Sequence, residues 1–314
     1  MTSYVYYQFQ LLFAYKKVNS KSARSSSHSA GPNFPQALSF LLPNPPFSFS
    51  NEDKLSHLSR LRALKHSGAS TWLTTIPTNS LTRLSNDHIA CAVRLRLGLQ
   101  PYTPLPHFCF ACSNSRSSRH SAAFDKNPYH HLCCPKFAGT FLTMRHDRIK
   151  YIIAQYAREA GIPTIVEPKG LDPLSKKRVD LQLFTPSTGS SLLVDISIVH
   201  PTAPSYSSLA SGRAADLRAQ HKINKHHSAS SSSPVLPVVI ESYGGFHSSC
   251  YPLFARIREG LMTSLASSSS ASVKYSEFLS SLSIALQSAN SQAIIGGRQL
   301  NLHRAAFNIV SQAA

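Results

Sequence analysis

Acidic residues are scarce in this chain of 314 residues. It has 14 Asp and Glu against 32 Lys and Arg, which gives a formal net charge of +18 at pH 7. So large a surplus exceeds what solubility needs and suits a polyanionic partner, for which nucleic acid is the default. The alternative is that the charge only keeps a Ser-rich surface soluble. Eight of the 14 acids lie between Asp147 and Glu241, so we expect carboxylate chemistry there.

Long apolar runs are absent, and so is the cysteine pattern of a secreted protein. No apolar run reaches membrane-spanning length, so we expect no membrane partner. Four of the six cysteines cluster between Cys109 and Cys134. That clustering favours a metal site in a reducing compartment over a disulfide framework.

The first 51 residues contain no acid and carry Lys16, Lys17, Lys21 and Arg24. This composition superficially matches a mitochondrial transit peptide. A disordered, low-complexity leader over residues 1–51 explains the same composition and is the interpretation we prefer.

Residues 52–105 have a helical pattern. Leu55, Leu58, Leu61 and Leu64 recur at three-residue spacing with basic residues between them, which predicts a basic amphipathic helix that ends before Gly68. A second helix is expected from Asn86 to Gly98, and Trp72 is expected to anchor the core between the two helices.

Residues 106–144 contain the spacing of a zinc site. Cys109 and Cys112 form a close pair, and a second pair of ligands follows about twenty residues later. His130 with Cys134 are one helical turn apart, so both can face one ion, while His131 and Cys133 compete as alternatives. Reduced, buried thiols without a metal are the other interpretation.

Residues 145–262 alternate helical and strand patterns. An apolar stripe from Ile149 to Ala160 predicts a helix, which Gly161 ends. A short strand from Thr164 to Glu167, a hairpin between Lys177 and Pro201, a helix and a strand follow. Residues 263–314 are expected to form a Ser-rich linker and C-terminal helices.

The hairpin carries two carboxylates. Asp180 enters its first strand, and Asp195 interrupts the β-branched second strand, so Asp195 is expected to be covered and to need a partner such as a cation. Two such carboxylates suit a hard divalent ion, although an Asp in a half-buried strand is more often a hydrogen-bonded structural residue. Glu167 ends the preceding strand.

The helix expected between Ala210 and His227 follows the hairpin. Leu217 and Ile223 are predicted on its apolar side. Lys222 and Lys225 are one turn apart and share a face.

This order of elements resembles the PD-(D/E)xK restriction-like nuclease fold. More closely, residues from about Ser70 to Gly260 are similar to the C-terminal region of non-LTR (LINE-type) retrotransposon proteins that carry such an endonuclease. The match rests on RLRLGL at 94–99, which resembles the end of a reverse-transcriptase thumb, on the Cys-Cys-His-Cys knuckle, on RHD at 145–147, and on KRVD with LLVDIS. Because the family's knuckle ends in H-x3-C, the resemblance favours His130 and Cys134 as ligands.

The resemblance implies an α/β fold with a mixed central sheet flanked by helices, preceded by a zinc knuckle and a helical segment. It implies that Asp180 and Asp195 bind a catalytic Mg²⁺, with Glu167 as a third carboxylate. Ser197 stands where the motif lysine is usual, so a lysine of the following helix, Lys222 or Lys225, would replace it. Val179 also departs from the usual Pro, which changes local rigidity more than chemistry.

The implied function is a Mg²⁺-dependent endonuclease that nicks one strand of a DNA target. We expect DNA and, as a second partner, RNA of the element, with the nucleus as the location and the mitochondrion as the alternative. The residues expected to contact nucleic acid are Arg145, Arg148, Lys176, Lys177 and Arg178.

No polymerase palm and no apolar-flanked Asp-Asp pair is found in the sequence, so the chain is similar to a severed fragment that can at most bind and cut. Two other interpretations remain open. One is a catalytically inactive nucleic-acid-binding remnant of a mobile element, and the other is an unrelated zinc protein with a structural role.

Overall fold

A computed structural model describes residues 51–102, 105–106, 108–113, 124, 127–169, 178–184, 189–206, 213–227, 235–265 and 267–313. The chain divides into two compact units, Met1–Lys54 and Leu55–Ala314. The predicted leader at residues 1–51 lies almost entirely outside the described residues. The segments predicted at 106–144, 145–262 and 263–314, and nearly all of that at 52–105, fall within the second unit.

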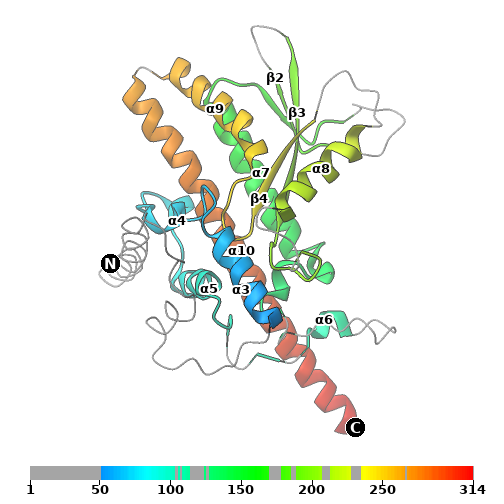
Figure 1. Ribbon diagram of the computed structural model, residues 1–314. Coiled ribbons are helices and arrows are strands. Elements are labelled where there is room, and N and C mark those ends of the chain that lie inside the picture. The colour runs from blue at the N-terminus through cyan, green and yellow to red at the C-terminus, as the bar shows by residue number, and fades with distance from the viewer. Residues whose placement is uncertain are drawn as a thin grey trace, which may run out of the picture. The chain divides into compact units, whose positions relative to one another are not determined.

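A mixed four-stranded sheet forms the centre of the α/β part (Figure 1). Its strands are β1 (Thr164–Val166), β2 (Leu181–Phe184), β3 (Ser191–Val199) and β4 (Val235–Glu241), in that spatial order. The first two pairings are antiparallel, and β3 pairs with β4 in parallel. The predicted α/β class is therefore confirmed, as is the order of helix α7 (Phe141–Glu159), strand, hairpin, helix α8 (Arg213–His227) and strand.

The two faces of β3 have different chemistry because successive side chains point to opposite sides of a strand. Val194 and Ile196 face the main apolar core, which they share with α7, α9 (Tyr251–Ser264) and α10 (Ser268–Ala313). Asp195 and Ser197 face α8 on the other side. The sheet therefore separates an apolar layer from a layer that holds charged groups.

Helix α8 packs on the sheet through its alanines. Leu217 and Ile223 were predicted on its apolar side, but this side does not face the sheet, because the two residues are 40% and 39% exposed. The buried apolar residues are Ala214, Ala215 and Ala219. Small side chains allow the helix to approach the strands closely, and larger ones would keep it away from the buried Asp195.

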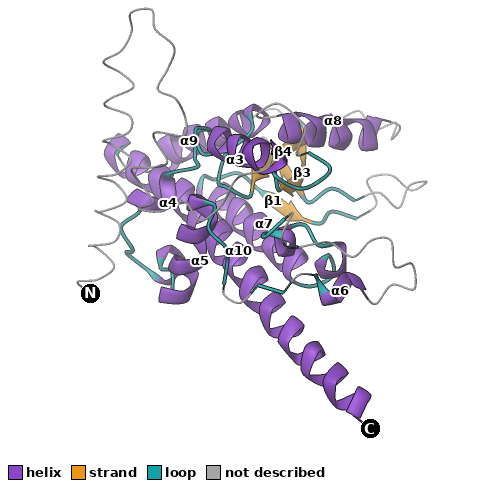
Figure 2. Cartoon of the chain, turned by 60° about the horizontal axis from the view of Figure 1, so that its bottom comes forward, coloured by secondary structure: helices purple, strands orange, loops and turns teal. Residues whose placement is uncertain are grey.

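The C-terminal region is one helix and not a linker followed by several helices. Helix α10 begins within the serine tract at Ser268 and continues to Ala313, 46 residues in all. It packs against α7, α9 and α5 (Asn86–Leu97), and Figures 1 and 2 show it running past these helices. The prediction of a Ser-rich linker is thus wrong, because three residues separate α9 from α10 and the remaining serines of the tract are helical.

Buried polar groups on α10 find partners on distant segments. Ser283 Oγ accepts a hydrogen bond from the backbone N–H of Trp72 (3.1 Å), and Asn290 donates to the carbonyl of Ser242 (2.7 Å). Each bond satisfies groups that would be costly to bury alone. Helix α10 therefore links the segment around Trp72 to the residue that follows β4.

The shorter helices are α3 (Asn51–Ala63), α4 (Thr71–Thr74), α6 (Phe110–Ser113), and the 3-10 turns η1 (Ser80–Thr82), η3 (His130–Leu132), η4 (Pro135–Phe137) and η5 (Ser248–Cys250). Helix α5 ends at Gly98 in the left-handed conformation (φ 71°), as predicted from the glycine. Trp72 is buried, also as predicted. Among the described helices, none is both long and apolar enough to cross a lipid bilayer.

A close approach between α10 and the cysteine region depends on two glycines. A Cβ atom on Gly297 would lie 2.1 Å from a ring carbon of His131, and one on Gly296 would lie 2.1 Å from the ring of Phe141. Glycine normally weakens a helix interior by about 1 kcal/mol relative to alanine. Here the absent side chain is what lets the rings pack against the helix.

We predict that Gly297→Ala lowers the free energy of unfolding. Overpacking costs about 1–3 kcal/mol, which outweighs the gain in helix propensity. Gly139→Ala is the matched control, because no atom lies within 4 Å of its would-be Cβ, so its stability should stay close to wild type. Urea unfolding of the three proteins measures the difference, and a Gly297→Ala protein as stable as wild type would contradict the packing argument.

Candidate functional site

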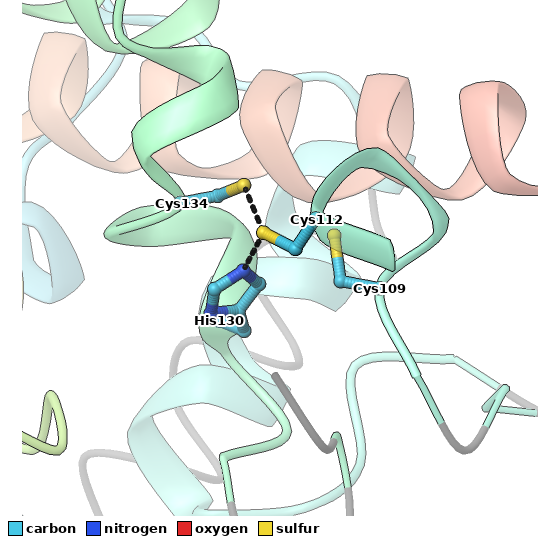
Figure 3. A group of neighbouring side chains, drawn as sticks. All are labelled: Cys109, Cys112, His130 and Cys134. Atoms are coloured by element: carbon cyan, nitrogen blue, oxygen red, sulfur yellow. Dashed lines mark hydrogen bonds between the residues drawn. The ribbon is translucent and has the colours of Figure 1, made fainter. Parts of the chain in front are cut away.

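Three cysteines and one histidine converge in a buried cluster (Figure 3). The ligand atoms of Cys109, Cys112, His130 and Cys134 all lie within 4.8 Å of one another. Cys112 Sγ lies 3.3 Å from His130 Nε2 and 3.5 Å from Cys134 Sγ. A tetrahedral zinc ion with ligands at about 2.0–2.3 Å holds its ligand atoms at similar separations. This Cys3His cluster could therefore bind a metal such as zinc.

Local structure explains how the four ligands meet. Cys109 precedes the single turn of α6 and Cys112 lies within it, so that the backbone N–H of Cys112 bonds to the carbonyl of Cys109 (3.0 Å). His130 begins η3 and Cys134 precedes η4. Hydrogen bonds from Cys134 and His130 lower the pKa of the Cys109 thiol, and the thiolate is the form that binds a metal.

The alternative ligands have other roles. His131 stacks between Phe124 and Phe137, with ring centroids 4.7 and 5.9 Å away, and burial lowers its pKa to about 4. Cys133 Sγ bonds to the carbonyl of His130 (3.5 Å) and lies outside the cluster. His131 is thus a neutral core residue, and the structure brings together the pair that the family resemblance favoured.

The second group of functional side chains lies where β2 and β3 pair. Leu181 is registered with Val194, and the backbone N–H of Asp180 bonds to the carbonyl of Val194 (2.9 Å), so Asp180 enters the sheet at the level of Asp195. Asp180 Oδ2 accepts a hydrogen bond from the N–H of Ile196 (2.6 Å) and lies 3.2 Å from His146 Nε2. Its other oxygen, Oδ1, has no hydrogen bond to any residue that the structure describes.

Asp195 is the buried acid of the site, at 2% exposure. Its Oδ1 accepts from Lys222 Nζ (2.5 Å), and its Oδ2 contacts His226 Nε2 (2.7 Å) and Lys225 Nζ (3.3 Å). Burial by itself would raise the pKa of Asp195, but the neighbouring Lys222, His226 and Lys225 lower it to about 2. The predicted helix lysines therefore both reach Asp195, and His226 was not anticipated.

Glu167 lies beside this group, but its side chain is paired elsewhere. Its backbone N–H bonds to the carbonyl of Asp180 (2.9 Å), and it adopts a positive φ of 50°, which is unusual for a residue with a side chain. Its carboxylate pairs with the buried Lys150 of α7, which also contacts Asp147 (2.8 Å). Among the described contacts, Glu167 does not join Asp180 and Asp195 through its side chain.

Sequence reasoning assigned no role to several cations of the site. His146 and Lys150 lie in the N-terminal half of α7, and Arg218 donates from Nε to Ser197 Oγ (2.7 Å). Spacing offered a signal for Arg218 and His226, because they lie four residues before and four residues after Lys222 and so share its helix face. For His146, to which no role had been assigned, the signal was its place in the RHD motif at 145–147.

The residues predicted to contact nucleic acid differ in how exposed they are. The prediction that Arg145 contacts nucleic acid is wrong, because its side chain is buried. Arg145 is 3% exposed and donates to Asn290 Oδ1 (2.9 Å) and to the carbonyl of Leu132 (3.1 Å). Arg148 is half-buried and donates to Ser288 Oγ (3.0 Å), whereas Arg178 is exposed. Lys176 and Lys177 lie outside the described residues.

Comparison with known proteins assigns this chain to no family. No protein-family model matches the chain, and no curated protein matches it.

We predict that the cluster holds one zinc ion per chain and that the ion depends on Cys134. Cys134→Ser should lose the ion because it removes a ligand thiolate, whereas Cys133→Ser should retain it. Metal analysis of the purified, reduced proteins by mass spectrometry gives the stoichiometry. Zinc missing from wild type, or lost equally from both variants, would contradict the assignment.

We predict that Asp195 stabilises the fold above about pH 4 in buffer without Mg²⁺. Its folded pKa of about 2 lies below the ordinary value of 3.8, so the unfolded chain binds the proton first as pH falls. This contribution, on the order of 2 kcal/mol at neutral pH, should disappear as pH falls from about 4 towards 2.

Urea unfolding of wild type and Asp195→Asn between pH 3 and pH 7 measures this contribution. The difference in unfolding free energy between wild type and Asp195→Asn should be largest at pH 7 and should become smaller below pH 4. Glu259→Gln, which changes an exposed carboxylate, is the control and should show no such narrowing. A gap for Asp195→Asn that does not change with pH would contradict the role of its charge.

Proposed function

We propose that this protein is a Mg²⁺-dependent endonuclease that nicks one strand of DNA and derives from a non-LTR retrotransposon. The observation that carries the proposal is the position of Asp180, directly before β2, opposite Asp195 of β3, with Lys222 and Lys225 of the next helix directed at Asp195. Carboxylates with an adjoining lysine are the groups that phosphodiester hydrolysis with a metal ion requires.

The order of elements supports the PD-(D/E)xK assignment. Helix α7, the strands β1, β2 and β3, helix α8 and the parallel strand β4 follow one another as in the fold that the sequence resembles. Asp180 directly precedes β2 and Asp195 lies within β3, and this arrangement supports the proposal. Ser197 occupies the position of the motif lysine, and Lys222 would take over the role of that lysine.

The carboxylate oxygens of Asp180 and Asp195 differ in how freely they could bind a hard cation. Asp180 keeps Oδ1 free of hydrogen bonds from described residues, which leaves an oxygen for Mg²⁺. Each oxygen of Asp195 already accepts from a cationic group, so Asp195 would share its remaining lone pairs with the ion. When bound, Mg²⁺ supplies an activated water and neutralises charge on the scissile phosphate.

The protein's own groups then have distinct roles. Asp180 and Asp195 would hold the ion, and the N–H of Ile196 fixes the Asp180 carboxylate. Lys222 or Lys225 would stabilise the charge that develops on the phosphate. We favour Lys222, because its Nζ lies closer to Asp195 (2.5 Å against 3.3 Å).

The Cys3His cluster would serve the same function indirectly. With four protein ligands, zinc there would have no open position for water, and its role would be structural. Target DNA, and RNA of the parent element, are the partners we propose, with the nucleus as the site of action.

The second candidate function is a nucleic-acid-binding remnant without activity. One observation favours it: Asp195 is already neutralised by two lysines and also contacts His226, so it needs no metal to be stable in the fold. Such a protein would bind DNA and would leave it intact with or without Mg²⁺.

We predict that wild type converts supercoiled plasmid to the nicked form in the presence of Mg²⁺, and that Asp180→Asn does so at least about 100-fold more slowly. Loss of a metal ligand removes several kcal/mol of transition-state stabilisation, which corresponds to this factor. Lys222→Ala should slow nicking more than Lys225→Ala. Glu259→Gln is the control and should nick at the wild-type rate.

Gel electrophoresis of time courses gives the rates, and circular dichroism confirms that each variant is folded. A folded Asp180→Asn protein that nicks at the wild-type rate would remove the catalytic assignment. Wild type that binds DNA without nicking it would instead establish the remnant.

A further inference from the structure

Helix α8 presents three cations to one face of β3. Arg218, Lys222 and Lys225 are spaced i, i+4 and i+7, which places them on one side of a helix. Lys222 and Lys225 contact Asp195, and Arg218 contacts Ser197, two residues further along the strand. The row of cations therefore extends beyond the carboxylate that it neutralises.

The charges in this row do not balance. Among the described contacts, Lys222 and Lys225 share one acid, Asp195, whereas Arg218 contacts only the neutral Ser197. Arg218 forms no ion pair with any carboxylate in the described part of the chain, although it is half-buried. A partly desolvated guanidinium without an anion is unfavourable unless a ligand supplies one.

Arg218 is also held in a fixed position. Its Nε donates to Ser197 Oγ at 2.7 Å, and Ser197 is itself 4% exposed and set in the middle of a strand. The two terminal nitrogens of the guanidinium have no hydrogen bond to a described residue. A guanidinium anchored through Nε offers those two nitrogens as a planar fork, which matches two oxygens of a phosphate.

We propose that Arg218 binds a backbone phosphate of the nucleic acid next to the phosphate at Asp195. The inference rests on the proposed endonuclease function and adds a recognition residue to it. Two residues along a strand span about 6.6 Å, so Arg218 and Lys222 act at separate points, as contacts with successive phosphates of one strand require. Ser197 is the positioning residue that orients the fork.

The test uses the full chain and a fluorescently labelled DNA duplex in buffer without Mg²⁺, so that binding is measured without cleavage. Arg218→Ala should weaken binding about 10- to 100-fold, which is what loss of a charged, bidentate contact costs. The slope of log affinity against log salt should fall by about one, because one phosphate contact is lost.

Two further variants separate orientation from charge. Arg218→Lys should keep the wild-type salt slope but not the wild-type affinity, since lysine keeps the charge and lacks the fork. Ser197→Ala should also weaken binding without changing the slope. Arg213→Ala is the control: Arg213 lies exposed at the start of the same helix and should change affinity less than twofold.

The outcomes distinguish a DNA contact of Arg218 from the binding of free phosphate and from the endonuclease function. Full DNA affinity in a folded Arg218→Ala protein, or an equal loss in Arg213→Ala, would overturn the proposal. If Arg218→Ala loses thermal stabilisation by inorganic phosphate while DNA binding stays unchanged, the ligand is free phosphate, and the nucleic-acid contact is refuted. Wild type that binds DNA through Arg218 but never nicks it would refute the endonuclease and retain this contact.

Discussion

A carboxylate in the middle of a buried strand must be matched by positive charge, and Asp195 imposes this condition on the structure around it. Helix α8 meets the condition with Lys222 and Lys225, which approach from two successive turns, and His226 adds a further contact. The helix can do so only if its packing face is small, and that face consists of Ala214, Ala215 and Ala219. The composition of α8 therefore follows from the acid beneath it.

The parts of the structure that could be predicted are those that a local sequence pattern determines. Helix α7 has a periodic apolar stripe, β2 alternates apolar and polar residues, and β3 and β4 are rich in β-branched apolar residues. The structure places these elements close to the expected residues. The Cys3His cluster was predictable because ligand spacing reflects the local turns that bring ligands to one ion. By contrast, an apolar stripe on α8 is a poor guide, because its buried face is polar and alanine-rich, and Leu217 remains exposed.

Long-range packing set the features that the sequence could not reveal. Arg145 is buried because it links α7 to Asn290 of α10 and to the carbonyl of Leu132, and no local pattern marks those partners. The serine tract at the start of α10 has the composition of a linker, yet Ser281 and Ser283 further along are buried against Tyr156 and Trp72. Tertiary contacts on both sides of this helix override its weak intrinsic preference.

The ion pairs at Asp195 are difficult to explain by stability alone. A buried carboxylate with its cations is often no more stable than apolar side chains of similar volume, because desolvation offsets much of the attraction. The α8 side of the sheet already has an apolar patch at Val199 and Val239 that could extend towards Asp195. Charges kept where apolar packing would serve equally well are typical of sites that act on a ligand. Arg218, in the same row of basic residues, pairs with no carboxylate among the described residues, which is why we propose an anionic ligand beside the Mg²⁺ that Asp180 and Asp195 would hold.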